Sequence, residues 1–333
     1  MKTGYDLRLG RNAHLALSEK SVLITGASGL IGANLALYLD WLCRTFGTKI
    51  NLTLQSKSGF FPFLNHIFTH PPSFVSADLT QIERIGELGE FDFIFQLAGY
   101  GQPGKFMADP IGTMILNSQA TQRLRGLANE RFLFAGTSEV YSGYVGPSPT
   151  ELNVGNTSSL HPRAPYIVSK LYGEVITNLR LSEFSNVGNT ARISLAYGPG
   201  VRLSDQRVMS DFINMGINSE QVSMADSGSR ERSYLYVSDA VELLTGIAIE
   251  GSGGIYNVGG TSNVTIRTLG QLIAEKLGVS FLAGEDSGVD SSPQSVSISM
   301  TKTLELLGDF EFIPLEYGLD RAIEWHRGLH ESG

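Results

Sequence analysis

Two short clusters in the sequence carry side chains that could move a proton. Tyr166 and Lys170 lie four residues apart in the string Tyr-Ile-Val-Ser-Lys, so a helix over this segment would put them on one face. An ammonium group beside a phenol favours the phenolate, which lowers the pKa of a tyrosine from its usual value of about 10. We therefore expect Tyr166 to act as a general base toward a hydroxyl group. The ordinary alternative is a pair of side chains on a surface helix.

The second cluster is Thr137-Ser138-Glu139, which precedes Tyr166 in the chain. It combines two hydroxyl groups with a carboxylate, residue types that hold polar substrates and transfer protons. The cluster follows a predicted strand over residues 131–135, and α/β proteins bind their ligands at the carboxyl ends of parallel strands. We expect these side chains and Tyr166 to share one site. The alternative for Glu139 is an exposed loop carboxylate.

A third motif predicts a bound dinucleotide. Residues 21–33 contain a β-branched run, three glycines and then an apolar, helix-compatible segment. In such a motif the first glycine forms the turn, the second lets the backbone approach a pyrophosphate, and the third lets the helix pack on the strand. The helix N-terminus then offers its N–H groups to the phosphates. The alternative is a glycine-rich turn without a ligand. The cofactor-binding residues predicted here are Gly26, Ser28, Gly29, Leu30, Ile31 and Gly32.

The following strands carry the residues expected around the adenosine. In NAD-binding versions of the motif an acidic residue near the end of the second strand binds the ribose, but here the sequence reads Gln55-Ser56-Lys57. Lys57 pairs with the 2′-phosphate of NADP in one interpretation. In the other it is a solvated lysine and NAD binds without the usual carboxylate. Asp78 ends a third predicted strand, where a carboxylate can accept from the adenine amino group. Further residues expected at this edge are Ser56, Leu79, Leu97 and Ala98.

The order of elements predicts an α/β fold. Strands and helices alternate up to residue 198, which is typical of a Rossmann-like doubly wound parallel sheet. Beyond it turn signals cluster and segments shorten, which predicts a smaller C-terminal α/β substrate-binding domain. The predicted parts are a surface helix or arm over 1–19, an NAD(P)-binding domain over 20–198 and a substrate domain over 199–333, with the chain crossing between the two domains. Strands are expected over 22–25, 50–54, 74–77, 91–97, 131–135 and 191–196, and helices over 31–46, 110–129, 164–181, 237–249, 266–277 and 315–327.

Composition argues against several classes of partner. The 333 residues carry a net charge of −8, with Lys and Arg scattered along the chain, so we expect no nucleic acid and no anionic membrane. Cys43 is the single cysteine and is expected in the core, without a disulfide framework. The chain shows neither an apolar run of membrane-spanning length nor a signal-peptide pattern, which predicts a cytoplasmic protein. The histidines, including His161, lack metal-ligand spacing, so we expect no metal.

Taken together, these motifs resemble a known family. Thr-Gly-x-x-Gly-x-x-Gly, the Thr137 cluster, Tyr-x-x-x-Lys and Tyr-Gly-Pro at residues 197–199 are similar to the extended short-chain dehydrogenase/reductases, the NAD-dependent sugar-nucleotide epimerases, dehydratases and decarboxylases. The resemblance runs from residue 21 to about residue 327. Within the family, local strings around 109–117, 162–164, 205–208 and 228–239 resemble the UDP-glucuronate decarboxylases.

The resemblance implies a reaction and assigns roles. Such enzymes retain the cofactor, oxidise C4 of the sugar, act on the 4-keto intermediate and return the hydride. Thr137 would bind the C4 oxygen, Tyr166 would be base and then acid, and Lys170 would bind the nicotinamide ribose. Glu139 would remove the C5 proton in a 4,6-dehydratase, or assist around the leaving carboxylate and reprotonation in a decarboxylase. Ser138 stands where dTDP-glucose dehydratases carry aspartate. The Thr-Ser-Glu form also occurs in GDP-mannose 4,6-dehydratases, so it excludes one subfamily and not the reaction.

Substrate residues follow from the same resemblance. Arg207 and Arg232 are expected to bind the diphosphate and sugar of a UDP-sugar, since guanidinium groups grip oxyanions with two hydrogen bonds. Asn117 would support the nucleotide sugar or the helix geometry. Arg163 and Arg230 are weaker candidates, and each arginine has a surface ion pair as its alternative.

Three further expectations concern the exact reaction and the assembly. Leu195 stands where the family usually has a substrate-contacting asparagine, which leaves a 4,6-dehydratase or a 4- or 5-epimerase as alternative activities. A catalytically silent NAD(P)-binding regulatory protein is the alternative of another class. Family members dimerise through helices that correspond to residues 110–128 and 164–182, so we expect a homodimer.

Overall fold

A computed structural model of the chain describes residues 5–59, 68–285 and 295–331. Its largest element is a seven-stranded sheet in the order β10-β6-β5-β4-β1-β2-β3, with every adjacent pair parallel. The order reverses between β1 and β4, which creates the switch point where doubly wound sheets bind ligands. The predicted fold class is confirmed. The strands are β1 (Ser21–Thr25), β2 (Asn51–Ser56), β3 (Ser73–Ser76), β4 (Phe91–Gln96), β5 (Ala128–Thr137), β6 (Val187–Ile193) and β10 (Gly254–Val258).

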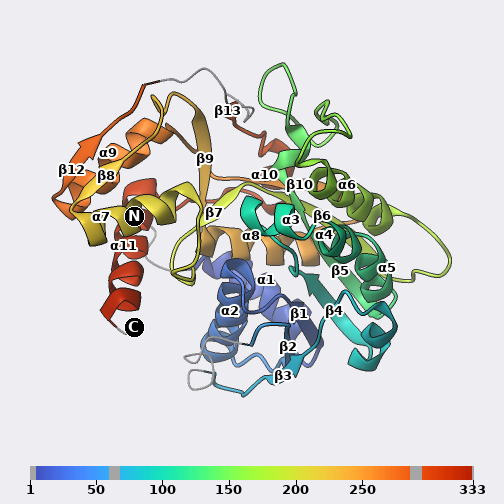
Figure 1. Cartoon of the computed structure of the whole chain (residues 1–333). Helices are drawn as coiled ribbons and strands as arrows, with labels where there is room; N and C mark the ends of the chain where they lie inside the picture. Colours follow the sequence, from blue (N-terminus) through green and yellow to red (C-terminus); the bar gives the residue numbers. More distant parts are fainter. Residues whose placement is uncertain (1–4, 60–67, 286–294, 332–333) are drawn as a thin grey trace.

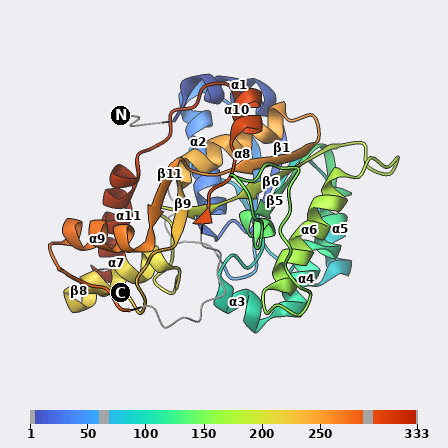
Figure 2. The same ribbon diagram turned by 90° about the horizontal axis from the view of Figure 1, so that it is seen from above.

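Helices cover both faces of this sheet, as Figure 2 shows. The central strand β1 is an apolar run because both of its faces are buried, and its residues Val22, Leu23 and Ile24 have no exposed surface. One face carries α1 (Leu7–Leu17), α2 (Leu30–Phe46), α8 (Val237–Glu250) and α10 (Thr301–Leu307). The other carries α4 (Pro110–Asn117), α5 (Gln119–Arg125) and α6 (Ala164–Asn178), with the shorter η2 (Ile82–Leu88) beside α5.

The smaller unit lies beside the carboxyl ends of the large sheet (Figure 1). Its central strand β9 (Glu231–Tyr236) pairs with β7 (Leu195–Tyr197), β11 (Ser262–Thr265) and β13 (Ser295–Val296). β8 (Gln221–Ser223) pairs with β12 (Ser280–Leu282). The helices of this unit are α7 (Val208–Ser219), α9 (Ile266–Leu277) and α11 (Leu315–Glu331).

The chain passes between the two units several times. After β7 and β9 it returns to the large sheet as α8 and β10, and then leaves again for β11 and α9. Residues beyond 199 therefore supply an edge strand and a covering helix of the large sheet. The domain division at 198/199 stays a prediction.

Three segments differ from the sequence expectation. The strand predicted over 191–196 is divided, since β6 ends at Ile193 and the following residues form β7, which pairs with β9 of the smaller unit. The helix predicted over 110–129 is two helices that break at Ser118 (φ −115°, ψ −84°), and β5 already begins at Ala128. The N-terminal segment is a docked helix and not an arm, because Leu9, Ala13 and Leu17 of α1 are buried. Such packing along one stripe is what an amphipathic helix needs to be stable.

Within the described part of the chain, none of the helices has the length and apolar character that crossing a membrane requires.

Candidate active site

The glycine turn after β1 has the shape that a dinucleotide requires. Gly26 has φ +67°, and a Cβ there would lie 2.7 Å from the Cα of Ala98. A Cβ on Gly32 would lie 2.4 Å from the carbonyl oxygen of Gly26, so this residue lets α2 pack close to the turn. Gly29 is the exposed N-cap of α2, and as a glycine it has no side chain that could cap the helix. The first-turn N–H groups of α2 can therefore meet an anion, and the residues present fit a bound NAD(P).

The adenosine end of this edge contains an ion pair. The ammonium of Lys57, just beyond β2, lies 2.8 Å from a carboxylate oxygen of Asp78, just beyond β3. Burial acts to raise the pKa of Asp78, but hydrogen bonds from Lys57 and Thr80 outweigh it and bring the pKa below its ordinary value. The hydrogen bond to Asp78 is the main cause that raises the pKa of Lys57. Both groups are therefore charged at neutral pH. Leu79, Leu97 and Ala98 lie near the same edge, and the Ala98 N–H donates to Thr25 Oγ1 at 3.2 Å.

Tyr166 lies at the carboxyl end of β5, and its ring is buried. The ring stacks on Phe106 of α3 (Pro103–Ala108) with centroids 4.3 Å apart. Its hydroxyl lies near enough to Thr137 for the Thr137 side chain to act on its pKa. Burial first, and then the charge of Glu139, raise the pKa of Tyr166, while Thr137 and the charge of Arg163 act in the opposite direction. The sum is a pKa above the ordinary value for tyrosine.

The expected effect of Lys170 on this phenol is therefore wrong for this structure. Lys170 shares a face of α6 with Tyr166, but its ammonium donates to the carbonyl oxygen of Ala135 at 2.6 Å and lies 5.9 Å from the Tyr166 ring centroid. Burial lowers the pKa of Lys170 to about 7, and the charge of Glu174 opposes this shift. Because both side chains are buried, desolvation of each charge outweighs their mutual effect.

Glu139 pairs with an arginine beside this tyrosine. Glu139 follows β5 in the short 3₁₀ helix η3 (Ser138–Tyr141), whose N-cap is Thr137. Its Oε1 accepts from Arg163 at 3.1 Å, whereas its buried Oε2 has no hydrogen-bond partner among the described residues. Arg163 is the N-cap residue of α6, three residues before Tyr166. The weaker arginine candidate is thus the one in contact with the catalytic cluster.

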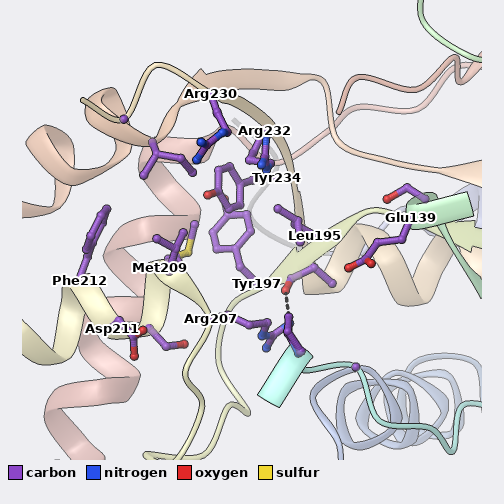
Figure 3. Close-up of a pocket in the computed structure, with 18 of the residues that line it drawn as sticks. Glu139, Leu195, Tyr197, Arg207, Met209, Asp211, Phe212, Arg230, Arg232 and Tyr234 are labelled. Carbon is purple, nitrogen blue, oxygen red and sulfur yellow. Dashed lines mark hydrogen bonds between the residues drawn. The ribbon is translucent and has the colours of Figure 1, made fainter. Parts of the chain in front are cut away.

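A cleft of about 750 Å³ opens beside this cluster, between the two units of the fold. Figure 3 shows Glu139 at one end, Arg207, Arg230 and Arg232 toward the middle, and Phe212 at the far side. Ser138 and Leu195 also line it. The lining residues come from η3, the 142–149 loop, the start of α6, β7, α7, β9 and α11.

The two predicted substrate arginines both line the cleft, and each of them is held by hydrogen bonds. Arg207 is gripped by both carboxylate oxygens of Asp205, at 2.6 to 3.0 Å, and donates to the Ala196 carbonyl at 3.1 Å. Arg232 donates to the carbonyl of Glu231 at 2.7 Å. A guanidinium held in this way is oriented before an oxyanion arrives, which reduces the entropy lost on binding.

Asn117 lies near Lys170, since a Cβ on Gly99 would be 3.6 Å from Asn117 Oδ1 and 3.5 Å from Lys170 Nζ. It is fully buried and donates to Ser169 Oγ at 3.0 Å, which joins α4 to α6. It is not among the described residues that line the cleft. Its position fits the helix-geometry role and gives no support to direct substrate contact.

Sequence reasoning missed a buried ion pair under the site. Glu174, one turn after Lys170 on α6, binds Arg192 of β6 through both carboxylate oxygens, at 2.9 and 3.0 Å. Arg192 also donates to the hydroxyl of Tyr141 at 2.9 Å, and Tyr141 lines the cleft. The four-residue spacing from Lys170 to Glu174 was the available signal. The pair links the floor of the cleft to the catalytic helix.

Within the ranges that the structure covers, no group of three or more His, Cys, Asp or Glu residues is arranged to hold a metal ion.

Comparisons with known proteins agree with this geometry. UDP-glucuronic acid decarboxylase 1 of Xenopus tropicalis is 29% identical over 324 residues, covering 93% of this chain and 74% of the relative. UDP-glucuronic acid decarboxylase 5 of Arabidopsis thaliana is 27% identical over 330 residues, covering 97% and 94%. Among solved structures, MoeE5 in complex with UDP-glucuronic acid and NAD superposes with a TM-score of 0.77 at 25% identity, covering 92% of this chain and 99% of MoeE5.

A second structure and a family profile complete the comparison. The epimerase Mth375 of Methanothermobacter thermautotrophicus has a TM-score of 0.82 at 21% identity, covers 97% of this chain and 96% of its own, and shows the shared fold. The profile of the NAD dependent epimerase/dehydratase family matches residues 22–259. With the glycine turn, the Tyr-x-x-x-Lys helix and the arginine-lined cleft in one structure, the chain belongs to the NAD dependent epimerase/dehydratase family.

Proposed function

We propose that this protein oxidises C4 of a nucleotide sugar with a retained dinucleotide and decarboxylates UDP-glucuronate. The observation that carries the proposal is that the Glu139–Arg163 pair lines one end of a cleft whose middle presents arginines, while Thr137 and Tyr166 lie directly behind this pair. The proposal is also supported by relatives named for this activity, whose similarity covers most of this chain.

The glycine turn and the N-terminus of α2 would hold the phosphates of the dinucleotide, which when bound would supply the hydride acceptor for C4 and the hydride donor for its reduction. Thr137 holds the C4 oxygen, and Tyr166 takes the hydroxyl proton as C4 becomes a ketone. This step requires the phenolate of Tyr166, whose pKa the positive charge of a nicotinamide bound beside it would lower. The C5 carboxylate is then a β-keto acid. The bond between C5 and the carboxylate breaks, CO₂ leaves, and the electron pair passes into an enolate of C4 and C5. A water molecule held by Glu139 then gives a proton to C5. Tyr166 gives its proton back to the C4 oxygen in the last step.

The other cleft groups have roles in the same sequence. Arg207 and Arg232 bind the diphosphate, because fixed guanidinium groups match oxyanions. Glu139 has one oxygen held by Arg163 and the other without a partner among the described residues, so the second oxygen is available to a sugar hydroxyl or a water near C5. Lys170 has a pKa of about 7, and so it can change protonation near neutral pH beside the nicotinamide ribose.

A 4,6-dehydratase or a 4- or 5-epimerase is the second candidate within the same family. These reactions share the oxidation at C4 and differ afterwards. Ser138 is buried and lines the cleft, and a serine hydroxyl is a poor acid for a departing C6 hydroxyl. Ser138 therefore argues against the dTDP-glucose subfamily of dehydratases and leaves the other 4,6-dehydratases and the epimerases as alternatives.

The test is to incubate the purified protein with UDP-glucuronate and either NAD⁺ or NADP⁺ and follow the products by mass spectrometry. We expect a UDP-pentose and CO₂. If the carboxylate stays intact under conditions where the protein binds UDP-glucuronate, the decarboxylase proposal is wrong. UDP-, GDP-, dTDP- and CDP-hexoses, screened for loss of water or for inversion, then identify the related reaction.

Replacement of Tyr166 by phenylalanine separates an enzyme from a silent regulatory protein. The phenol is the proposed proton acceptor, and loss of such a group costs about 10²- to 10⁴-fold in rate. We expect kcat to fall by this amount while dinucleotide affinity, measured by calorimetry, stays within about twofold. Phe106→Leu, which alters the ring stacked on Tyr166, is the control and keeps most of the activity. Unchanged turnover in Tyr166→Phe would contradict the catalytic assignment.

A further inference from the structure

Three serine hydroxyls gather where β2 ends. Ser56, the last residue of β2, is buried, and its Oγ lies 2.7 Å from Oγ of Ser28 in the glycine turn. Ser28 Oγ lies 3.4 Å from Oγ of the exposed Ser58. Ser56 Oγ also accepts from the Ser58 N–H at 3.2 Å and can donate to the Gly59 carbonyl at 2.9 Å. Ser56 thus orients Ser28 and Ser58, whose hydroxyl hydrogens can turn toward a ligand. We refer to Ser28, Ser56 and Ser58 as the serine cluster.

In dinucleotide-binding folds, the residues at the end of the second strand determine whether the bound adenosine ribose carries a 2′-hydroxyl or a 2′-phosphate. A carboxylate at the end of the second strand accepts from a ribose 2′-hydroxyl and repels a 2′-phosphate. Here that strand ends in the neutral Ser56, and the next side chain is the exposed cation Lys57. Hydroxyl and ammonium groups donate to phosphate oxygens, and charge-assisted bonds of this kind are stronger than neutral ones. The chemistry at this point matches a dianion better than a hydroxyl.

The carboxylate of Asp78 does not restore the missing acid. Its Oδ1 accepts from both the N–H and the Oγ1 of Thr80, at 3.0 and 2.7 Å. Its Oδ2 lies 2.8 Å from Lys57 Nζ. Through these contacts Asp78 positions the side chain of Lys57. The ammonium has three donor hydrogens, so the others remain available when one is directed at Asp78.

We infer that the serine cluster and Lys57 form a ribose 2′-phosphate site, so that this member of the family prefers NADP⁺ to NAD⁺. The inference rests on the dinucleotide-binding part of the proposed function and is independent of the sugar chemistry. Ser28 and Ser58 donate hydrogen bonds to the phosphate, Lys57 neutralises part of its charge, and Asp78 holds Lys57 in place.

The experiment is calorimetric titration of the whole protein, stripped of cofactor by denaturation and refolding or by dialysis, with NADP⁺ and NAD⁺. Two fragments without nicotinamide, 2′,5′-ADP and ADP, isolate the adenosine end. We expect NADP⁺ and 2′,5′-ADP each to bind at least tenfold more tightly than the partner that lacks the 2′-phosphate. The preference should shrink with added salt, because the site is exposed. Equal affinities, or tighter binding of NAD⁺, overturn the inference.

Two variants test the residues. Lys57→Gln should weaken NADP⁺ binding about tenfold and leave NAD⁺ binding unchanged, and Ser56→Asp should reverse the preference. Lys49→Gln removes an exposed lysine that precedes the opposite end of β2 and is the matched control, with no change for either cofactor. NAD⁺ binding by Ser56→Asp verifies that this variant is folded. If Lys57→Gln binds NADP⁺ as tightly as the wild type, Lys57 is not a phosphate ligand and the inference fails.

The failure of this inference is distinguishable from the failure of the proposed function. A refolded protein that binds neither dinucleotide contradicts both. A protein that prefers NAD⁺ and converts UDP-glucuronate contradicts only the 2′-phosphate site. A protein that prefers NADP⁺ and leaves UDP-glucuronate intact contradicts only the proposed reaction.

Discussion

At the scale of single residues, the site depends on contacts that change the charge state of buried groups. Burial and the charge of Glu139 raise the pKa of Tyr166, and the positive charge of Arg163 opposes that rise. The same Arg163 holds Glu139 through an ion pair in which both side chains are about 30% exposed (31% and 27%). Arg163 therefore acts on two members of the catalytic cluster, although we assign it no direct step in the reaction.

Replacing Arg163 with glutamine tests this positioning role. Without the guanidinium, Glu139 is no longer held at 3.1 Å, so we expect kcat for the nucleotide sugar to fall about tenfold or more with KM changing by less than about threefold, in line with loss of a fixed orientation. Arg163→Lys should recover part of kcat. Arg84→Gln breaks an exposed pair with Glu87 and is the control with wild-type kinetics. A rise in KM alone would instead make Arg163 a substrate anchor.

At the scale of elements, the glycine turn and α2 form one unit. Gly32 is the position where α2 lies closest to the turn, since an added Cβ would be 2.4 Å from the Gly26 carbonyl oxygen. α2 ends at Gly47, which has φ +69° and closes the helix with a left-handed cap. A displaced α2 would move the N–H groups that face the phosphates.

Gly32→Ala is therefore expected to lower dinucleotide affinity at least tenfold and to reduce stability by about 1 to 3 kcal/mol, the usual cost of overpacking. Calorimetry and urea unfolding measure the two effects. Gly86→Ala is the matched control, because nothing lies within 4 Å of a Cβ there and its backbone is not left-handed, so both quantities should stay at wild-type values. Wild-type affinity in Gly32→Ala would show that the close approach of α2 does not matter.

At the scale of the whole molecule, the two units meet at the cleft and each contributes to its lining. α11, near the C-terminus, brings His326 to the cleft, where its Nδ1 lies 3.0 Å from Asn214 Oδ1 of α7. On the face of the large sheet opposite to α2 and α8, α4 and α6 lie side by side. Both helices present apolar side chains to solvent. These are Ile111 (66% exposed), Met114 (41%), Val168 (48%), Tyr172 (49%) and Val175 (59%).

The buried His326 makes stability depend on pH. Burial lowers its pKa from 6.5 to about 4, with His330 acting in the same direction and Asp205 against it. In this range the unfolded chain binds a proton more readily than the folded one, so stability falls as the pH falls from about 6.5 toward 4. We expect His326 to account for about 2 kcal/mol of this loss. Urea unfolding across this range should show a shallower dependence for His326→Gln, whereas exposed His70→Gln should match the wild type. Identical curves for all three proteins would refute the assignment.

The apolar face of α4 and α6 is the predicted homodimer interface, since solvent-exposed apolar side chains on adjacent helices favour burial against a second copy. Light scattering should give twice the 36.1 kDa mass of the chain at micromolar concentration. Val175→Glu, on the exposed side of α6, should give the monomer mass. Leu152→Glu, at a side chain 96% exposed outside α4 and α6, should leave the dimer intact. A monomeric wild type would make the prediction wrong.

The sequence by itself determined the elements and the chemistry of the site. Three glycines at fixed spacing, the period of the strands and the Tyr-x-x-x-Lys pair are local signals, because backbone conformation and helix faces depend on residues close in the chain. They were enough to predict the parallel sheet, the turn for a dinucleotide and the edge where Thr137, Glu139 and Tyr166 meet. They did not show the break at Ser118, where the helix predicted over 110–129 divides into α4 and α5.

Only the tertiary structure decided which side chains are partners. Lys57 meets Asp78 across two strands, Arg163 meets Glu139 across a loop, and Lys170 turns to the Ala135 carbonyl instead of the Tyr166 hydroxyl. Each of these contacts joins residues distant in sequence, so its geometry depends on how strands and helices pack. The pKa values follow from the same packing, because burial removes water from a charge and no local pattern records how much water is removed. For this reason the sequence predicts the catalytic groups, and the fold sets their charges and orientations.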